Sequence, residues 1–134
     1  MNKEELMIGD WVFNTHNQQP EQVVEIRERM VMLAYNDLYD YDEIEPILLT
    51  SELLESNGFK KFNFHDIEDQ HQWSWWHDTL TSVTLWTREL KDDNKDGWML
   101  RIESQLSTCC LRVDYIHQLQ HCMKDSKIKK EIKL

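Results

Sequence analysis

Residues 98–123, WMLRIESQLSTCCLRVDYIHQLQHCM, carry two hydrophobic patterns in succession. From Trp98 to Glu103, and again from Cys109 to Asp114, apolar and polar side chains alternate, which is typical of antiparallel strands. From Tyr115 to about Lys124, the apolar residues recur at helical spacing and form one narrow stripe, made of Ile116, Leu119 and Met123. This stretch therefore predicts an antiparallel sheet with a C-terminal helix packed on it.

The same two-residue alternation recurs upstream and predicts further strands. In the second half of the chain, strands are expected at residues 60–65, 73–76 and 81–88. In the first half, they are expected at residues 11–13, 22–29, 30–35 and, in a short form, 39–44. Most of the chain is therefore predicted to be antiparallel sheet.

A short helix separates the two groups of strands. Thr50 is a suitable N-cap and Asn57-Gly58 is a suitable stop, so the helix is expected at about residues 51–57. We therefore predict an α+β fold, in which a small β-barrel or curled sheet precedes the helix and an antiparallel β-meander with a packed C-terminal helix follows it. Residues 1–58 are expected to form an acidic β-rich subdomain and residues 59–134 the second sheet with its helix, together in one compact unit.

The negative charge is confined to the first part of the chain. Residues 1–58 carry 13 Asp or Glu against 3 Lys or Arg, which gives -10, whereas residues 59–134 carry 12 of each sign. An acidic surface attracts basic proteins and repels nucleic acid and membrane lipid, so neither of the latter is an expected partner. We predict a non-enzymatic interaction module that binds a basic protein partner. A cluster of acidic residues can also be a simple solvated face without a partner. The candidate partner-binding residues are Asp37, Tyr39, Asp40, Tyr41, Asp42, Glu43 and Glu45.

The end of the chain has the opposite charge. Residues 124–134 contain five Lys against one Asp and one Glu. This segment is expected to be a frayed tail, or to add an edge strand at residues 132–134. Neutralisation of the acidic surface by these lysines would remove the case for electrostatic docking.

Two histidines suggest an alternative function. His117 and His121 lie four residues apart on one face of the predicted helix, and Cys122 is adjacent. Two imidazoles at this spacing can share a zinc ion if a third ligand is present, so the alternative is a small metal-binding or hydrolytic enzyme. A solvated helix face with a small buried cysteine explains the same residues. No catalytic residue, metal site or cofactor is assigned.

The segment from Asp92 to Glu103 matches the pattern of an EF-hand calcium loop. An EF-hand needs a helix on each side, and the flanking residues are typical of strands instead. We therefore favour a hairpin turn rich in Asp, Asn and Gly.

Five tryptophans fall on the predicted strands of the second half. They are core residues or a stacking surface, but Trp75 and Trp76 are adjacent and cannot both point inward from a one-sided sheet. Some of them should therefore be exposed, and an exposed Trp is a reasonable anchor for an interface. The full set is Trp73, Trp75, Trp76, Trp86 and Trp98.

The bulk composition points to a cytoplasmic protein. No apolar stretch approaches the roughly 18 residues that span a bilayer, and the polar start has no signal-peptide pattern. Three cysteines, two of them adjacent, make a poor disulfide framework and indicate a reducing compartment.

Three segments together resemble a known family: Leu6–Val12, Ile44–Thr50 running to Phe59, and Tyr115–Gln120. In this order and at this length, they resemble small uncharacterised proteins of gut Bacteroides-type bacteria and their phages or mobile elements. The resemblance implies a cytoplasmic protein of phage or mobile-element type without an assigned activity, and it leaves a structural or self-assembly role in a phage as a third alternative. The family usually has an Asn-like residue where His121 stands, which weakens the zinc hypothesis.

The opening Gly9-Asp10-Trp11-Val12, with strands to about Ile44, is similar to the start of small SH3-like barrels. Such barrels often bind peptides or nucleic acid. This similarity is one of fold and does not by itself determine a function.

Overall fold

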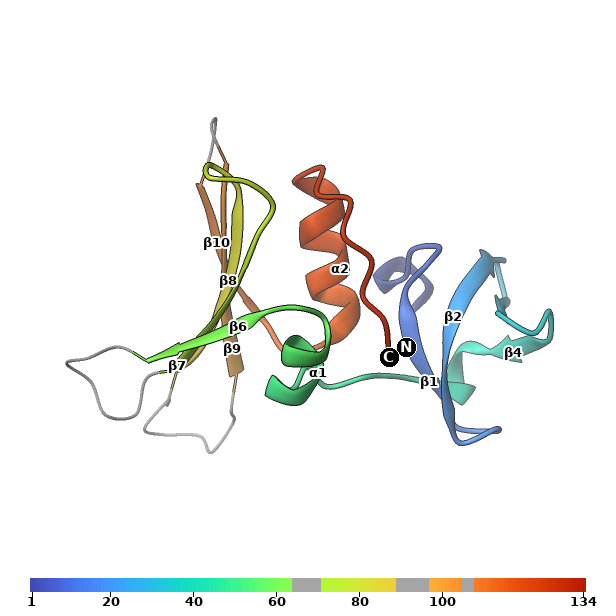
Figure 1. Ribbon diagram of the computed structural model, residues 1–134. Coiled ribbons are helices and arrows are strands. Elements are labelled where there is room, and N and C mark those ends of the chain that lie inside the picture. The colour runs from blue at the N-terminus through green and yellow to red at the C-terminus, as the bar shows by residue number, and fades with distance from the viewer. Residues whose placement is uncertain (64–70, 89–96, 105–107) are drawn as a thin grey trace.

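The computed structural model describes residues 1–63, 71–88, 97–104 and 108–134. Two five-stranded antiparallel sheets lie on either side of the helix α2 (Ile116–Asp125), and the C-terminal tail runs beside this helix (Figure 1). The predicted α+β class and the packed C-terminal helix are confirmed. Neither described helix has the length or the apolar character needed to cross a bilayer.

The first sheet has the strand order β4-β3-β2-β1-β5. Its strands are β1 (Trp11–Asn14), β2 (Gln19–Ile26), β3 (Met30–Leu33), β4 (Leu38–Asp40) and β5 (Ile44–Pro46). Two short 3-10 helices accompany them, η1 (Lys3–Glu5) and η2 (Tyr41–Glu43). The strands β4 and β5 form opposite edges and do not pair, so this fully described sheet is open and is not a closed barrel.

The first sheet has its own small core because alternate side chains of β1 and β3 point to the same side. Val12 and Val31 are fully buried there, and Leu33 has no exposed surface either. Tyr39 of β4, one of the predicted partner-binding residues, also lies in this core and is only 7% exposed. The complete cluster is Leu6, Val12, Val23, Val31, Leu33, Tyr39 and Ile44.

The second sheet is a meander in which each strand pairs with the next one in sequence, as the alternating pattern predicts. Its strands are β6 (Lys60–Asn63), β7 (His71–Trp76), β8 (Ser82–Arg88), β9 (Gly97–Glu103) and β10 (Thr108–Val113). Their register places Trp73 opposite Leu85, Leu85 opposite Leu100, and Leu100 opposite Leu111. One face of the sheet is therefore apolar, and α2 covers it (Figure 1).

The helices follow the sequence signals closely. α1 (Ser51–Ser56) begins where the Thr50 side chain accepts a hydrogen bond from the Leu53 N–H at 3.2 Å. α2 buries the predicted stripe completely, with Ile116, Leu119 and Met123 at most 1% exposed. The buried stripe explains how a ten-residue helix remains stable, since so short a helix depends on packing.

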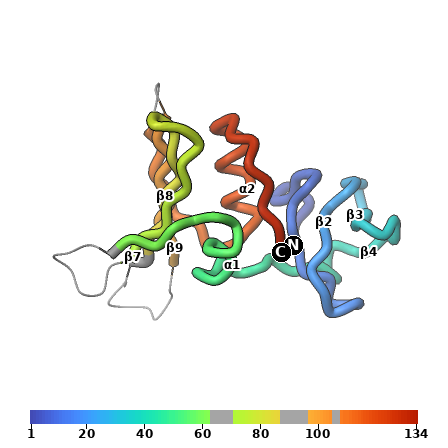
Figure 2. Tube along the Cα trace, in the orientation of Figure 1, coloured from blue at the N-terminus to red at the C-terminus, as the bar shows by residue number. Residues whose placement is uncertain are grey.

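The second core also takes up α1 and the tail. Leu49, Leu54 and Phe59 pack with the second sheet, so the two cores divide between Ile44 and Leu49. The sequence placed this boundary later, at residue 58. The tail is neither frayed nor an edge strand, because Ile128 and Ile132 are buried in the same core while the segment has no strand assignment. Its backbone runs alongside α2 (Figure 2).

Candidate functional site

The predicted acidic residues follow one another along the chain, from the turn before β4 (Asp37) through β4 (Asp40) and η2 (Asp42, Glu43) to β5 (Glu45). We call Asp37, Asp40, Asp42, Glu43 and Glu45 the acidic surface. All except the half-buried Glu43 are exposed, and within the described residues none of them forms an ion pair. Their charges therefore face solvent.

The tyrosines between these carboxylates support the acidic surface from beneath. Tyr39 is buried, and its hydroxyl oxygen accepts a hydrogen bond from Asn17 at 3.0 Å. Tyr41 is half-buried, and its hydroxyl donates to the carbonyl oxygens of Arg27 and Met30. Tyr39 cannot contribute its ring to a partner contact, whereas both side chains fix the backbone that carries the acids.

Glu4, which the sequence reasoning did not include, adjoins the acidic surface. The Met1 amino group donates to the Tyr41 and Ile44 carbonyl oxygens at 3.0 and 3.3 Å, which brings η1 against η2. Burial, and secondly the nearby Glu4 carboxylate, raise the pKa of Tyr41. Glu4 therefore lies close to η2, although the two segments are some 40 residues apart in sequence.

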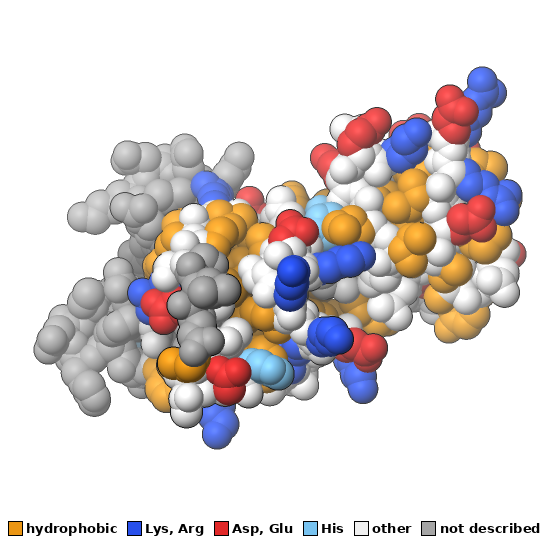
Figure 3. All heavy atoms as spheres, turned by 90° about the horizontal axis from the view of Figure 1, so that it is seen from above, with side chains coloured by type: hydrophobic (Ala, Val, Ile, Leu, Met, Phe, Trp, Pro, Cys, Tyr) orange, Lys and Arg blue, Asp and Glu red, His pale blue; other side chains and the backbone are white. Residues whose placement is uncertain are grey.

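Three other acids of the first part, Asp10, Glu21 and Glu25, do not add free charge to this surface, so the expectation of one coherent acidic field is too broad. Asp10 and Glu21 are each only 2% exposed, and Glu25 pairs with Arg27 at 2.8 Å. Figure 3 shows basic and acidic side chains side by side over the N-terminal half on the face that it presents. The tail lysines form no described ion pair with the acidic surface, so they do not neutralise it through direct contacts.

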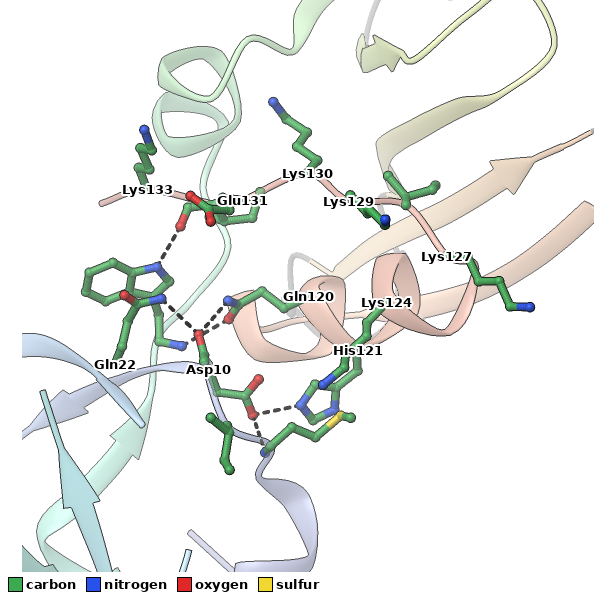
Figure 4. Close-up of a pocket in the computed structure, with 16 residues that line it drawn as sticks. Asp10, Gln22, Gln120, His121, Lys124, Lys127, Lys129, Lys130, Glu131 and Lys133 are labelled. Carbon is green, nitrogen blue, oxygen red and sulfur yellow. Dashed lines mark hydrogen bonds and ion pairs between the residues drawn. The ribbon is translucent and has the colours of Figure 1, made fainter. Parts of the chain in front are cut away.

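The two histidines of α2 face β1 rather than the second sheet. Nε2 of His121 lies 2.7 Å from Oδ2 of Asp10, and the same oxygen accepts a hydrogen bond from the Met7 N–H at 2.8 Å (Figure 4). The His117 ring lies edge-on to the His121 ring, with 5.6 Å between centroids. Asp10 is thus the acidic partner of this histidine pair.

His117 is buried without a full set of partners. It is 5% exposed, it stacks on the Tyr115 ring, and its Nδ1 atom has no hydrogen-bond partner. Burial lowers the pKa of His117, and the charge of His121 lowers it further, while Asp10 and Glu5 act in the opposite direction. The neutral imidazole is therefore favoured.

These residues do not assemble a metal site in the part of the chain that the structure describes. No three His, Cys, Asp or Glu side chains converge there. Cys122 is half-buried, and burial raises its pKa to about 11, so it stays a thiol rather than a thiolate ligand or nucleophile. Residues 92–96 of the candidate calcium loop lie outside the described residues. The rest of the segment, Gly97–Glu103, is the strand β9, and the strand β8 precedes the segment where an EF-hand has a helix.

Asp10 and His121 lie where the start of β1 contacts α2 and the tail. We call this contact, made by Gly9, Asp10 and Trp11 with Gln120, His121 and Ile132, the seam. The Gln120 side chain pairs with the backbone of β1, because its Nε2 donates to the Gly9 carbonyl at 3.0 Å and its Oε1 accepts from the Trp11 N–H at 3.0 Å. The Trp11 indole N–H donates to the Ile132 carbonyl at 2.7 Å. These partners are more than 100 residues apart, and no sequence signal pairs them.

The seam forms one side of a cleft of about 770 Å³ between β1, the end of α2 and the tail (Figure 4). Lys124, Lys127, Lys129, Lys130 and Lys133 line it, and we call it the lysine cleft. Sequence reasoning missed this cleft because it expected the tail to be frayed or an edge strand.

The tryptophans divide between core and surface, as their alternation predicts. Trp73 and Trp98 are buried edge-on at 5.2 Å between ring centroids, and Trp75 packs against the same core. Trp76 points to the other face and is 57% exposed. The tryptophans therefore do not form one common stacking surface.

No family model matches the sequence, and no curated protein or solved structure is significantly similar to it. The resemblance to the Bacteroides and phage proteins stays a prediction.

Proposed function

We propose that the protein is a non-enzymatic interaction module whose acidic surface binds a basic protein partner. The observation that carries this proposal is the run of carboxylates from Asp37 to Glu45, of which all but the half-buried Glu43 are exposed and none forms an ion pair among the described residues. Charges of this kind steer a partner of opposite sign and select against partners of like sign.

The backbone under these carboxylates is fixed, which favours binding. The Glu43 carbonyl accepts hydrogen bonds from the Thr15 N–H and hydroxyl at 2.9 and 2.8 Å. The Glu43 carboxylate accepts one from the Asp40 N–H at 2.9 Å. A segment that is already ordered loses little conformational entropy when a partner docks.

The setting of this module is part of the same proposal. The family resemblance supports a cytoplasmic protein of phage or mobile-element type in a Bacteroides-type bacterium. The similarity of its opening to SH3-like barrels supports kinship of the open first sheet with that fold.

Partner capture with isosteric variants tests the proposal. The acidic-surface variant carries Asp37→Asn, Asp42→Asn and Glu45→Gln. The control variant carries Glu28→Gln, Glu52→Gln and Asp125→Asn, which remove the same charge from exposed acids on other elements. Both variants and the unchanged protein serve as bait in lysate of the host, at about 50 and 300 mM salt.

The proposal expects a basic protein that the unchanged protein retains at low salt and loses at high salt. With that protein purified, the acidic-surface variant should bind about tenfold more weakly than the control variant, because close complementary charges set the affinity. Recovery of nothing salt-sensitive would overturn the proposal, and so would equal binding by the two variants.

A further inference from the structure

The lysine cleft is built from three segments that are distant in sequence. Met7 to Trp11 forms one side, Gln120 to Lys124 at the end of α2 forms the floor, and the tail forms the other side (Figure 4). Its volume of about 770 Å³ falls within the range of sites for small organic molecules.

The charge of the cleft is opposite to that of the whole chain. Five Lys line it against two acids, Asp10 and Glu131, which gives a formal +3 in a chain of net charge -10. Asp10 is 2% exposed, and one of its oxygens already accepts from Met7 and contacts His121. Little negative charge therefore faces the cleft besides Glu131.

Most of these lysines have no partner for their charge. In the described part of the chain, none of the five pairs with a carboxylate. The ammonium group of Lys130 lies 4.7 Å from the centroid of the Trp75 ring, and burial lowers the pKa of Lys130. This lysine therefore packs against the second core rather than standing free in the cleft. Lys124 extends from α2 toward His121 in Figure 4, whereas Lys127 points outward.

The fold holds the tail that carries the lysines. Ile128 and Ile132 are buried on either side of Lys129, and Asn57 exchanges two hydrogen bonds with the backbone of Lys133, at 2.7 and 2.9 Å. The backbone that carries Lys129 and Lys133 is therefore ordered before any ligand binds.

We propose that the lysine cleft binds a small phosphate-bearing organic molecule. Lys124, whose side chain extends toward His121, and the exposed Lys129 supply ammonium groups without a carboxylate partner among the described residues, and such point charges suit a phosphate. Met7, Ile8 and Trp11 supply apolar wall beside the cations, which suits an organic group attached to the phosphate.

Titration with adenosine diphosphate and with inorganic phosphate tests the inference, using calorimetry and amide NMR shifts of the unchanged protein. The cleft variant is Lys124→Gln with Lys129→Gln. The control variant is Lys60→Gln with Lys61→Gln, which removes two exposed charges from β6. All four side chains are exposed, so the variants should fold, and denaturation of each variant confirms this before titration.

The inference expects saturable binding of the diphosphate, shifts at the amides of Gly9, Gln120 and His121, and weaker binding of inorganic phosphate. The cleft variant should bind the diphosphate about tenfold more weakly, and the control variant within about twofold of the unchanged protein. Absence of saturation at about 10 mM diphosphate overturns it, as does equal weakening in both variants or equal affinity for inorganic phosphate.

Discussion

The two sheets have the same number of strands and very different cores. Among the described residues, seven buried apolar side chains fill the first sheet and fifteen fill the second, the latter with α2 and the tail included. Because stability rises with the apolar area removed from water, most of it should reside in the second half. The first sheet therefore depends on the seam as well as on its own core, and it is the half that carries the acidic surface.

The largest expected effect tests the larger core. Leu119 has no exposed surface and lies on the stripe of α2 that packs on the second sheet. Leu119→Ala should lower the free energy of unfolding by about 2–5 kcal/mol, because it removes buried methyl groups and leaves a cavity. Urea denaturation measures this loss.

Leu80→Ala is the matched control for that change, since Leu80 is 54% exposed. It should change the free energy of unfolding by less than about 0.5 kcal/mol. Equal effects of the two substitutions would contradict the packing of α2 on the second sheet.

A smaller effect is expected at the seam that joins the two cores. Gln120→Ala removes both side-chain hydrogen bonds to the backbone of β1 and leaves the part-buried Trp11 N–H without its acceptor. The cost should be about 1–3 kcal/mol. Amide hydrogen exchange should show β1 opening before β9, because only the seam has been weakened.

Gln19→Ala provides the comparison at the seam, because Gln19 is exposed and has no side-chain hydrogen bond among the described contacts. In this variant, β1 and β9 should exchange their amide hydrogens in the same order as in the unchanged protein. If Gln120→Ala also left β1 as protected as β9, the first sheet would be stable without the seam.

The parts of the fold that the sequence predicted are those governed by local patterns. The stripe Ile116, Leu119 and Met123 recurs within ten residues, and the strands of the meander pair with their sequence neighbours. Thr50 and Gly58 mark the limits of α1 because caps and stops act within a few residues.

The seam and the lysine cleft could not be predicted, because they join Gly9 to Gln120 and Trp11 to Ile132 across most of the chain. The candidate site was predicted only in part for a related reason. Charge marks Asp37, Asp42 and Glu45 as surface residues, but it cannot show that Tyr39 is buried beneath them or that Glu4 lies nearby. Tertiary contacts decide both.

The smallest effect concerns the pH response of the seam. Burial lowers the pKa of His117 below its ordinary value of 6.5. The unfolded chain therefore binds more protons than the folded chain as pH falls below about 6.5, and the stability linked to this residue, complete above that pH, is lost progressively. The groups that face His117 are Asp10, His121 and Glu5.

His117→Asn removes this titration, so the free energy of unfolding of the variant should fall less with decreasing pH than that of the unchanged protein. The difference in unfolding free energy between the two proteins should narrow from pH 7.5 to pH 5.5, as measured by urea denaturation at each pH. A gap that stays constant or widens for His117→Asn would mean that the imidazole is not desolvated at the seam, and that the two halves meet less closely than the contacts of Asp10 and Gln120 require.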